Sequence, residues 1–268
     1  MSIPGRHFLR NLVERRALVA QLVRRDFHQR YVGSAAGWLW GIVHPLVQLS
    51  IWYFVFQVCL QMELPDTAPT RSYALFVMAG YLPWMLFQET VTRSAGSLVD
   101  HAGLITKTVF PSEVVAVSIF LSSMIHHLIG VVLVMAASVI MTHALSPLVV
   151  LLPVYMFFVG LLGVGIGWIA SSLHVYLRDT GQVLNVVMTV WLWLTPVMIS
   201  ADKIPADYRF LIQWNPMSFV VEAYRSRLLT AAWPDPAQLG MIAAYSVAVF
   251  VAGGFFFRHL KRGFADVL

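Results

Sequence analysis

Three long stretches of the chain carry no charged side chain, and they constrain the fold more than any other feature. Residues 31–62, 114–177 and 180–201 contain no Asp, Glu, Lys or Arg. A helix rises about 1.5 Å per residue, so about 20 apolar residues cross a hydrocarbon core about 30 Å thick. Each stretch is long enough to span a membrane, and residues 114–177 are long enough to span it twice. The sequence therefore predicts an all-α, polytopic membrane protein.

Composition agrees with this prediction. The chain is 59% hydrophobic and only 12% charged, whereas soluble domains carry about 25% charged residues. Seven of its 18 Lys and Arg residues lie within residues 1–30, before the first apolar run. This placement indicates a membrane surface rather than nucleic acid as the partner of the positive charge. A single cysteine, Cys59, excludes an intramolecular disulfide.

We predict six transmembrane helices. The first is about 36–61, and the second is 73–92, broken at Pro83. The third and fourth lie within 114–177 and are divided near 142–147, the fifth begins at Thr180, and the sixth is about 237–257. With six spans, thirteen Lys and Arg fall on the side of the termini and five on the other. The excess predicts a multi-pass protein of the bacterial inner (cytoplasmic) membrane with both termini cytoplasmic.

Residues 1–31 form a basic amphipathic segment. Apolar residues from Leu9 to Tyr31 recur at spacings of three to four, and arginines fill most other positions. This pattern predicts a cytoplasmic interface helix in the headgroup region of an anionic leaflet, followed by a six-helix transmembrane domain over 32–268. Such a helix serves either as a plain anchor or also as a docking surface for a partner.

The chain lacks the motifs of an enzyme. It has no G-x-x-x-x-G-K-[ST] phosphate loop, no HExxH zinc motif and no GxSxG nucleophile elbow. His126 and His127 lie mid-span, where ionisable groups are costly and often functional. The alternative is two neutral imidazoles bonded to helix carbonyls. We therefore predict no catalytic residue and no metal site, and expect transport driven by a partner that hydrolyses nucleotide.

Five stretches of the chain together resemble one family. They are RDFHQRYVGSAAGWLWGIVHPL (25–46), GYLPWMLFQETVTRS (80–94), LITKTVFPSEV (104–114), YLRDTGQVLNV (176–186) and LTPVM…IPADYRFLIQWNP…VVEAYR (194–225). In this order they resemble the membrane subunits of ABC polysaccharide exporters, the O-antigen, capsule and teichoic-acid export permeases. The resemblance covers nearly the whole chain, and the teichoic-acid and O-antigen branches are the more similar.

The resemblance implies a half-transporter. A second copy of the chain would pair with it around a channel, and two copies of a separate ABC ATPase subunit would bind the cytoplasmic side. The chain itself would bind no cofactor, because ATP and Mg would belong to the partner. A coupling helix at about 95–108 would enter the ATPase, and a re-entrant extracytoplasmic segment would lie at about 202–233, broken at Asn215-Pro216. The implied ATPase-coupling residues are Arg24, Arg25, Asp26, Ser97, Asp100, His101, Leu104 and Lys107.

The implied substrate is a lipid-linked polysaccharide. A sugar polymer needs a path whose walls make many weak, sliding contacts, and aromatic faces stack on sugar C–H groups with little loss of rotamer entropy. The candidate channel residues are Trp52, Tyr53, Phe56, Tyr81, Trp84, Trp191 and Trp193. The alternative for half or more of these rings is a position facing lipid or a neighbouring helix.

Other functions remain open at this stage. Within the same class, the chain could be the permease of an ABC drug or lipid exporter. From other classes, it could be an integral-membrane glycan-modifying enzyme, which would need a cluster of acids and histidines in a cavity, or a passive six-helix channel.

Overall fold

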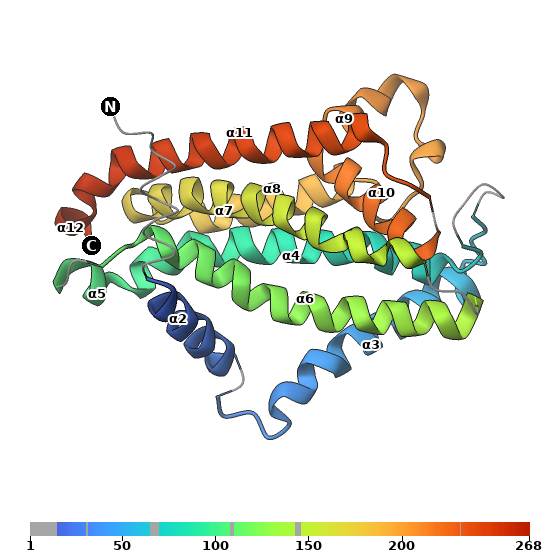
Figure 1. The fold of residues 1–268 in the computed structure, drawn as a ribbon, viewed down its shortest axis with the longest axis horizontal. Helices are drawn as coiled ribbons and strands as arrows, with labels where there is room; N and C mark the ends of the chain where they lie inside the picture. The colour runs from blue at the N-terminus through green and yellow to red at the C-terminus, as the bar shows by residue number, and fades with distance from the viewer. Residues whose placement is uncertain (1–14, 31, 65–69, 108–109, 143–145, 231) are drawn as a thin grey trace.

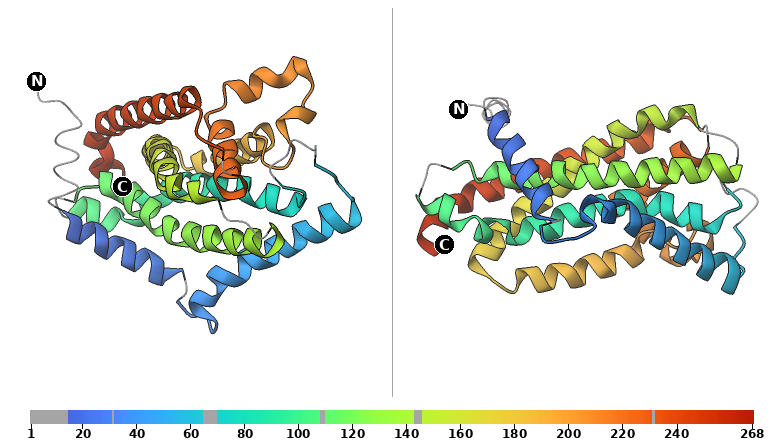
Figure 2. Two further views of the ribbon diagram at one scale, coloured as in Figure 1. Left: turned by 45° about the vertical axis from the view of Figure 1, so that its right-hand side comes forward. Right: turned by 90° about the horizontal axis from the view of Figure 1, so that it is seen from below.

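The chain folds as one elongated bundle of helices (Figure 1). The structure, a computed structural model, describes residues 15–30, 32–64, 70–107, 110–142, 146–230 and 232–268. Across these residues all regular secondary structure is helical, as predicted for an all-α membrane protein. Nearly all the long helices run along the long axis of the bundle, whereas α2 and α3 diverge from it obliquely (Figures 1 and 2).

The longer helices are α2 (Arg16–Gln29), α3 (Trp40–Trp52), α4 (Tyr73–Asp100), α6 (Glu113–Thr142), α7 (Leu152–Tyr176), α8 (Thr180–Leu194), α10 (Pro216–Leu229) and α11 (Pro236–Leu260). The shorter ones are η1 (Gly37–Leu39), the π-helical η2 (Tyr53–Cys59), α5 (Ala102–Lys107), η3 (Pro147–Leu151), η4 (Ala201–Lys203), η5 (Ala206–Tyr208), α9 (Arg209–Gln213), η6 (Lys261–Gly263) and α12 (Phe264–Val267). We call the end of the bundle that carries α5 and α12 the α5 end.

Helix α4 forms the centre of the bundle. It packs against α3, α6, α7, α8 and α10, and most of its side chains from Tyr73 to Leu98 are buried. Because neighbouring helices shield it, α4 can carry polar residues such as Gln88, Glu89 and Arg93 without exposing them to lipid. Its sequence is accordingly less hydrophobic than those of the more exposed α6 and α11.

Four stretches of the described chain are long and apolar enough to cross a membrane: Gly37–Cys59, Glu113–Met141, Pro147–Tyr176 and Pro236–Gly263. Helix α4 has 28 residues but is more polar, and α8 is apolar but has only 15. The structure is therefore that of a polytopic membrane protein, while the count of six spans stays a prediction.

Several helices begin at a capping residue followed by proline. The Asn215 side chain accepts a hydrogen bond of 3.0 Å from the Met217 amide, and Pro216 is the first residue of α10. Asp235 caps α11 in the same way, at 2.9 Å from the Ala237 amide. Proline fits the first turn of a helix because its missing N–H has no intrahelical partner there. The predicted break at Asn215-Pro216 is confirmed, since α9 ends at Gln213.

The predicted break at Pro83 is wrong. Helix α4 continues through this residue from Tyr73 to Asp100. An interior proline costs about 3 kcal/mol because it removes a backbone hydrogen bond and crowds the preceding turn. The residues around Pro83, including Leu82 and Trp84, are buried by neighbouring helices. Tertiary packing on all sides of α4 therefore outweighs the local cost.

Helix α7 packs closely against its neighbours through glycines. A Cβ built on Gly163 would lie 3.2 Å from the Thr90 side chain of α4, and one on Gly167 would lie 2.8 Å from Ser94. On another face, Gly165 meets Gly253 of α11 so closely that a Cβ on Gly253 would overlap the Gly165 carbonyl. The sequence spacing predicted a small-residue packing face over Gly160, Gly163 and Gly167, and the structure confirms it.

The two mid-span histidines have different partners. His127 is buried, with Nδ1 3.2 Å from the Leu82 carbonyl and Nε2 3.0 Å from the Tyr224 hydroxyl, so it joins α6 to α4 and α10. The carbonyl-bonded alternative thus describes His127. His126 also bonds the helix backbone, at Ser122, and in addition lies 3.2 Å from a guanidinium nitrogen of Arg30, close to α2.

Candidate coupling site between α2, α4 and α5

An amphipathic helix attaches to the bundle near the α5 end. Only Val19 and Leu22 of α2 are buried, and they pack with Val114 at the start of α6. This small apolar cluster follows from the helical spacing of the apolar side chains in α2. Leu18 and Val23 pack beside this cluster, and a polar part of the attachment lies at the C-terminal half of the helix.

Four alternating charges join α2 to α4. Arg93 makes a bidentate pair with Asp26, with N···O distances of 2.5 and 3.1 Å, and Arg30 pairs with Glu89. Two longer N···O contacts of 3.6 Å lie within the helices, between Arg30 and Asp26 and between Arg93 and Glu89. All four side chains are partly buried, so water screens them less than it screens surface pairs. We call Asp26, Arg30, Glu89 and Arg93 the four-charge cluster.

The cluster lowers the pKa of Asp26. Burial acts in the opposite direction and favours the neutral acid, but the hydrogen bonds from Arg93 and the charges of Arg93 and Arg30 outweigh it. A carboxyl group whose pKa is lowered on folding stabilises the protein above its unfolded pKa of about 4. That stabilisation is lost as the pH falls through the folded value.

We therefore expect Asp26→Asn to lower the free energy of unfolding by about 2 kcal/mol at neutral pH, because hydrogen bonds to charged groups are worth about this much. The difference between wild type and variant should shrink as the pH falls below about 4 and through the lowered folded pKa of Asp26, where the carboxyl group becomes neutral. Unfolding midpoints measured across this pH range check the prediction. Asp207→Asn, an exposed carboxylate on η5, is the matched control. A pH-independent difference would contradict the assigned role of the charge.

A polar cavity of about 470 Å³ lies beside the cluster, between α2, α4 and α6. Arg25 Nη2 lies 3.1 Å from His101 Nε2 at the end of α4, and His101 Nδ1 lies 2.8 Å from the Ser97 carbonyl oxygen. In the tautomer that fits, Nδ1–H donates to Ser97 and Nε2 accepts from Arg25. The imidazole thereby links α2 to the last turn of α4.

Beyond this cavity the central helix continues into α5. After a turn at His101, α5 runs from Ala102 to Lys107, and its Leu104 and Lys107 side chains are exposed. The C-terminal segment supports it: α12 contacts α5, Phe264 is buried, and Lys261 pairs with Glu113 at 2.5 Å. A short exposed helix is thus attached to the central helix of the bundle.

Sequence comparison identifies the protein family. The profile of the ABC-2 type transporter family matches residues 17–229, from α2 to the end of α10. The chain belongs to the ABC-2 type transporter family. It is 27% identical over its full length to an O-antigen export system permease protein RfbA of Klebsiella pneumoniae, and the match covers all of that relative.

Two further relatives extend the comparison. An O-antigen export system permease protein RfbA of Myxococcus xanthus is 25% identical over 96% of this chain and 98% of its own. A polysialic acid transport protein KpsM of Escherichia coli is 22% identical over 88% of this chain and 90% of its own. The family match supports a transport subunit over the glycan-modifying enzyme considered from sequence.

The structure of this ABC-2 transporter brings most of the predicted coupling residues together. Arg25, Asp26, Ser97, Asp100 and His101 all line the polar cavity. Three others lie elsewhere: Leu104 and Lys107 are exposed on α5, and Arg24 lies on another face of α2, in a groove against α6. The predicted single helix over 95–108 is corrected, since residues 95–100 belong to α4 and only Ala102–Lys107 form α5.

Arg30, Glu89 and Arg93 were not among the predicted site residues. The sequence feature that could have indicated them is charge spacing. Asp26 with Arg30 and Glu89 with Arg93 are both i, i+4 pairs of opposite charge. That spacing predicts pairs within each helix. The pairing between helices, Asp26 with Arg93 and Arg30 with Glu89, depends on the tertiary fold.

The predicted channel aromatics lie in several settings. Trp52 is buried and packs edge-on against Tyr81, with 4.8 Å between the ring centroids. Trp191 packs edge-on against Trp84, with 6.3 Å between the ring centroids. Trp84 itself has no exposed surface and donates its indole N–H to Gln88, so it is a core residue rather than a channel wall in this structure. The exposed rings are Tyr53 and Trp193, at 45% and 68%, and Phe56 is partly buried against Tyr73.

Proposed function

We propose that this chain is the transmembrane subunit of an ATP-driven exporter that moves a lipid-linked polysaccharide of O-antigen, capsule or teichoic-acid type across the bacterial inner membrane. The end-to-end match to permeases named for O-antigen export supports the substrate class. In the proposed assembly two copies of the chain pair around the path. Two copies of a separate ATPase supply the energy from ATP and Mg, with both termini of this chain on the cytoplasmic side.

One structural observation carries the mechanism: α5 is the exposed continuation of the most buried helix. A force applied to α5 at Leu104 passes directly into α4, because only the turn at His101 separates the two helices. Helix α4 extends to the opposite end of the bundle and contacts α3, α8 and α10 along its length. A docked ATPase would therefore move the wall of the path through a single lever.

The four-charge cluster gives α2 a part in the same movement. Because Asp26 and Arg30 hold α2 to Glu89 and Arg93, a shift of α4 carries α2 with it. An ATPase that touches both α2 and α5 would sense one rigid surface rather than two independent ones. The exposed rings Tyr53 and Trp193 are the described candidates for polymer contact, since both keep a free face in the single chain.

We expect Leu104→Asp to weaken binding of the partner ATPase about tenfold or more, because a charge would replace an apolar anchor at the centre of the contact. Polysaccharide export should fall in parallel, while the variant should still fold because Leu104 is exposed. Pull-down titration of the co-expressed ATPase and assay of surface polymer check this. Leu211→Asp, an equally exposed leucine on α9 at the end of the bundle away from α5, is the control (Figure 1).

Two results would count against the proposal. Wild-type export by Leu104→Asp would remove α5 from the coupling path. Transport of polymer by the purified chain in liposomes without any ATPase would remove the external energy source altogether.

A further inference from the structure

A groove of about 730 Å³ between α2 and α6 is apolar inside and carries two arginines. Val19, Val23 and Phe27 line it from α2, and Leu121 and Ile125 line it from α6. Its polar lining residues are the exposed Arg16 and Arg24, with Ala20 between them. The groove lies on a different face of α2 from the four-charge cluster and the polar cavity.

The two arginines share one face of α2. Residues 16, 20 and 24 are separated by four positions each, so their side chains lie in one row along the helix. The two α-carbons are about 12 Å apart along the axis at a rise of about 1.5 Å per residue. Flexible guanidinium side chains can converge from that separation over the small Ala20. Within the described part of the chain, neither Arg16 nor Arg24 has an acidic partner, whereas Arg30 and Arg93 are both paired.

The two walls of the groove indicate that it lies at the membrane surface. One wall is an amphipathic helix of the interfacial type, and the other is the first half of α6, a stretch apolar enough to cross the membrane. Helix α2 leaves the bundle obliquely from the α5 end (Figures 1 and 2). Val19 and Leu22 are the only residues of α2 that are buried against the bundle, so its groove-lining residues Val23 and Phe27 stay partly exposed in the single chain.

We propose that this groove binds one anionic phospholipid of the surrounding membrane. Its acyl chain lies along Val23, Phe27, Leu121 and Ile125, and its phosphate lies over Ala20 between the Arg16 and Arg24 guanidiniums. Charge complementarity selects an anionic over a zwitterionic headgroup, and the apolar floor selects a lipid over a soluble anion. The bound lipid covers the apolar surface that the groove leaves open between the two helices, and so holds α2 on α6. This proposal does not depend on which polymer is transported.

The test uses the purified full-length chain in detergent, titrated with phosphatidylglycerol or phosphatidylcholine while the thermal-unfolding midpoint is measured. Phosphatidylglycerol should raise the midpoint of the wild type more than phosphatidylcholine does. Arg16→Gln and Arg24→Gln should each weaken the apparent affinity for phosphatidylglycerol about fivefold, because one basic residue at a membrane surface contributes about that factor. Arg258→Gln removes an exposed arginine of α11 and should leave the affinity unchanged.

A second pair of variants tests the groove itself. Ala20→Phe fills the space between the arginines and should abolish the difference between the two lipids. Ala17→Phe places the same ring on an exposed position of α2 outside the groove and should keep it. Photoactivatable phosphatidylglycerol should cross-link to α2 and α6 in the wild type and not in Ala20→Phe.

Three outcomes would overturn the proposal. They are equal stabilisation by the two lipids, cross-links confined to other helices, and binding of a polyprenyl phosphate but not of phosphatidylglycerol. Protection of the groove by the partner ATPase alone, with no dependence on lipid, would also overturn it. If Ala20→Phe fails to fold, the two arginine variants and the cross-link map still decide the question.

Discussion

Replacing Gly253 with leucine should abolish stable folding of this transporter. A Cβ at this position overlaps the backbone carbonyl of Gly165, so no side-chain rotation can relieve the clash. Overpacking of a relaxed core already costs about 1–3 kcal/mol, and here two helix backbones would have to separate. We expect a loss of more than about 3 kcal/mol, seen as little monodisperse protein after extraction in mild detergent.

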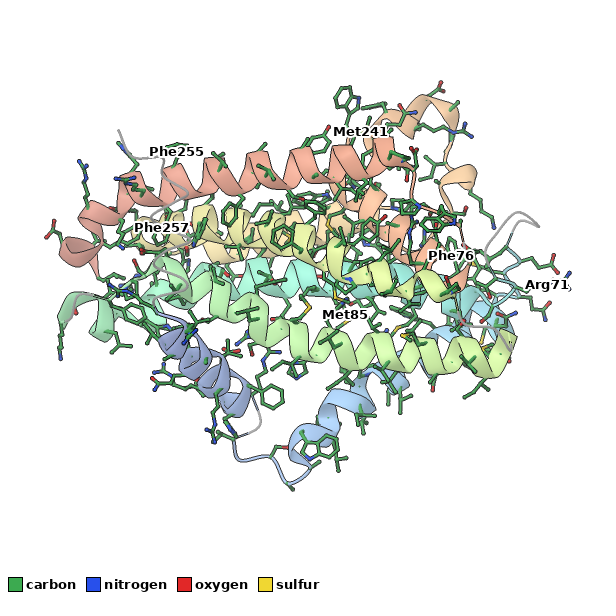
Figure 3. All side chains as sticks on the ribbon, in the orientation of Figure 1. Arg71, Phe76, Met85, Met241, Phe255 and Phe257 are labelled. Atoms are coloured by element: carbon green, nitrogen blue, oxygen red, sulfur yellow. The ribbon has the colours of Figure 1, made fainter. Side chains whose placement is uncertain are left out.

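Gly240→Leu is the matched control, because it lies on the same helix and a Cβ there meets nothing within 4 Å. It should purify as the wild type does. The exposed Phe255 and inward-facing Phe257, labelled in Figure 3, mark the outer and inner faces of α11 near Gly253. If Gly253→Leu and Gly240→Leu are equally stable, the two helices do not touch at this point.

Replacing Arg225 with methionine should lower the free energy of unfolding by about 3 kcal/mol or more, because Arg225 holds together the end of the bundle away from α5. The Arg225 side chain is 1% exposed, and it donates to the Phe76 carbonyl at 3.1 Å and the Val197 carbonyl at 2.6 Å. Its guanidinium also lies 3.6 Å from the Phe76 ring centroid. Phe76 is labelled in Figure 3 at the end of the bundle away from α5. Methionine fills the space but leaves two carbonyls without their donor.

The comparison with Glu222→Gln separates packing from charge. Glu222 is 54% exposed and 3.7 Å from Arg225, so its loss should cost less than about 1 kcal/mol. Denaturant or thermal unfolding of both variants measures the difference. An Arg225→Met protein as stable as Glu222→Gln would mean that the two carbonyls find other donors.

Features encoded by neighbouring residues were predictable from the sequence. The apolar runs predict membrane helices, and the apolar spacing in residues 16–29 predicts the amphipathic α2. Asn215-Pro216 predicts the start of a helix. Each depends on periodicity or capping, which act over one or two turns. Five of the predicted coupling residues also met in one cavity, and for these the guide was the family resemblance rather than local physics.

The rest required the tertiary fold. Asp26 and Arg93 are 67 residues apart, and neither local pattern indicates that the two helices meet there. Pro83 predicts a break that the packing around α4 overrides. Its neighbour Trp84 fits the pattern of a channel residue, because aromaticity does not distinguish a core position from a channel wall. Burial is a property of the assembled bundle, so sequence alone could not assign these rings.

The glycine contact between α7 and α11 has a mechanical consequence. Two helices joined backbone to backbone cannot slide past each other without separating, so α7 and α11 would move as one unit. By contrast, only 6% of the most apolar window of Gly37–Cys59 is buried, against 50% for Pro147–Tyr176. The helices over Gly37–Cys59 are therefore held less firmly by the rest of the single chain than the α7–α11 unit is.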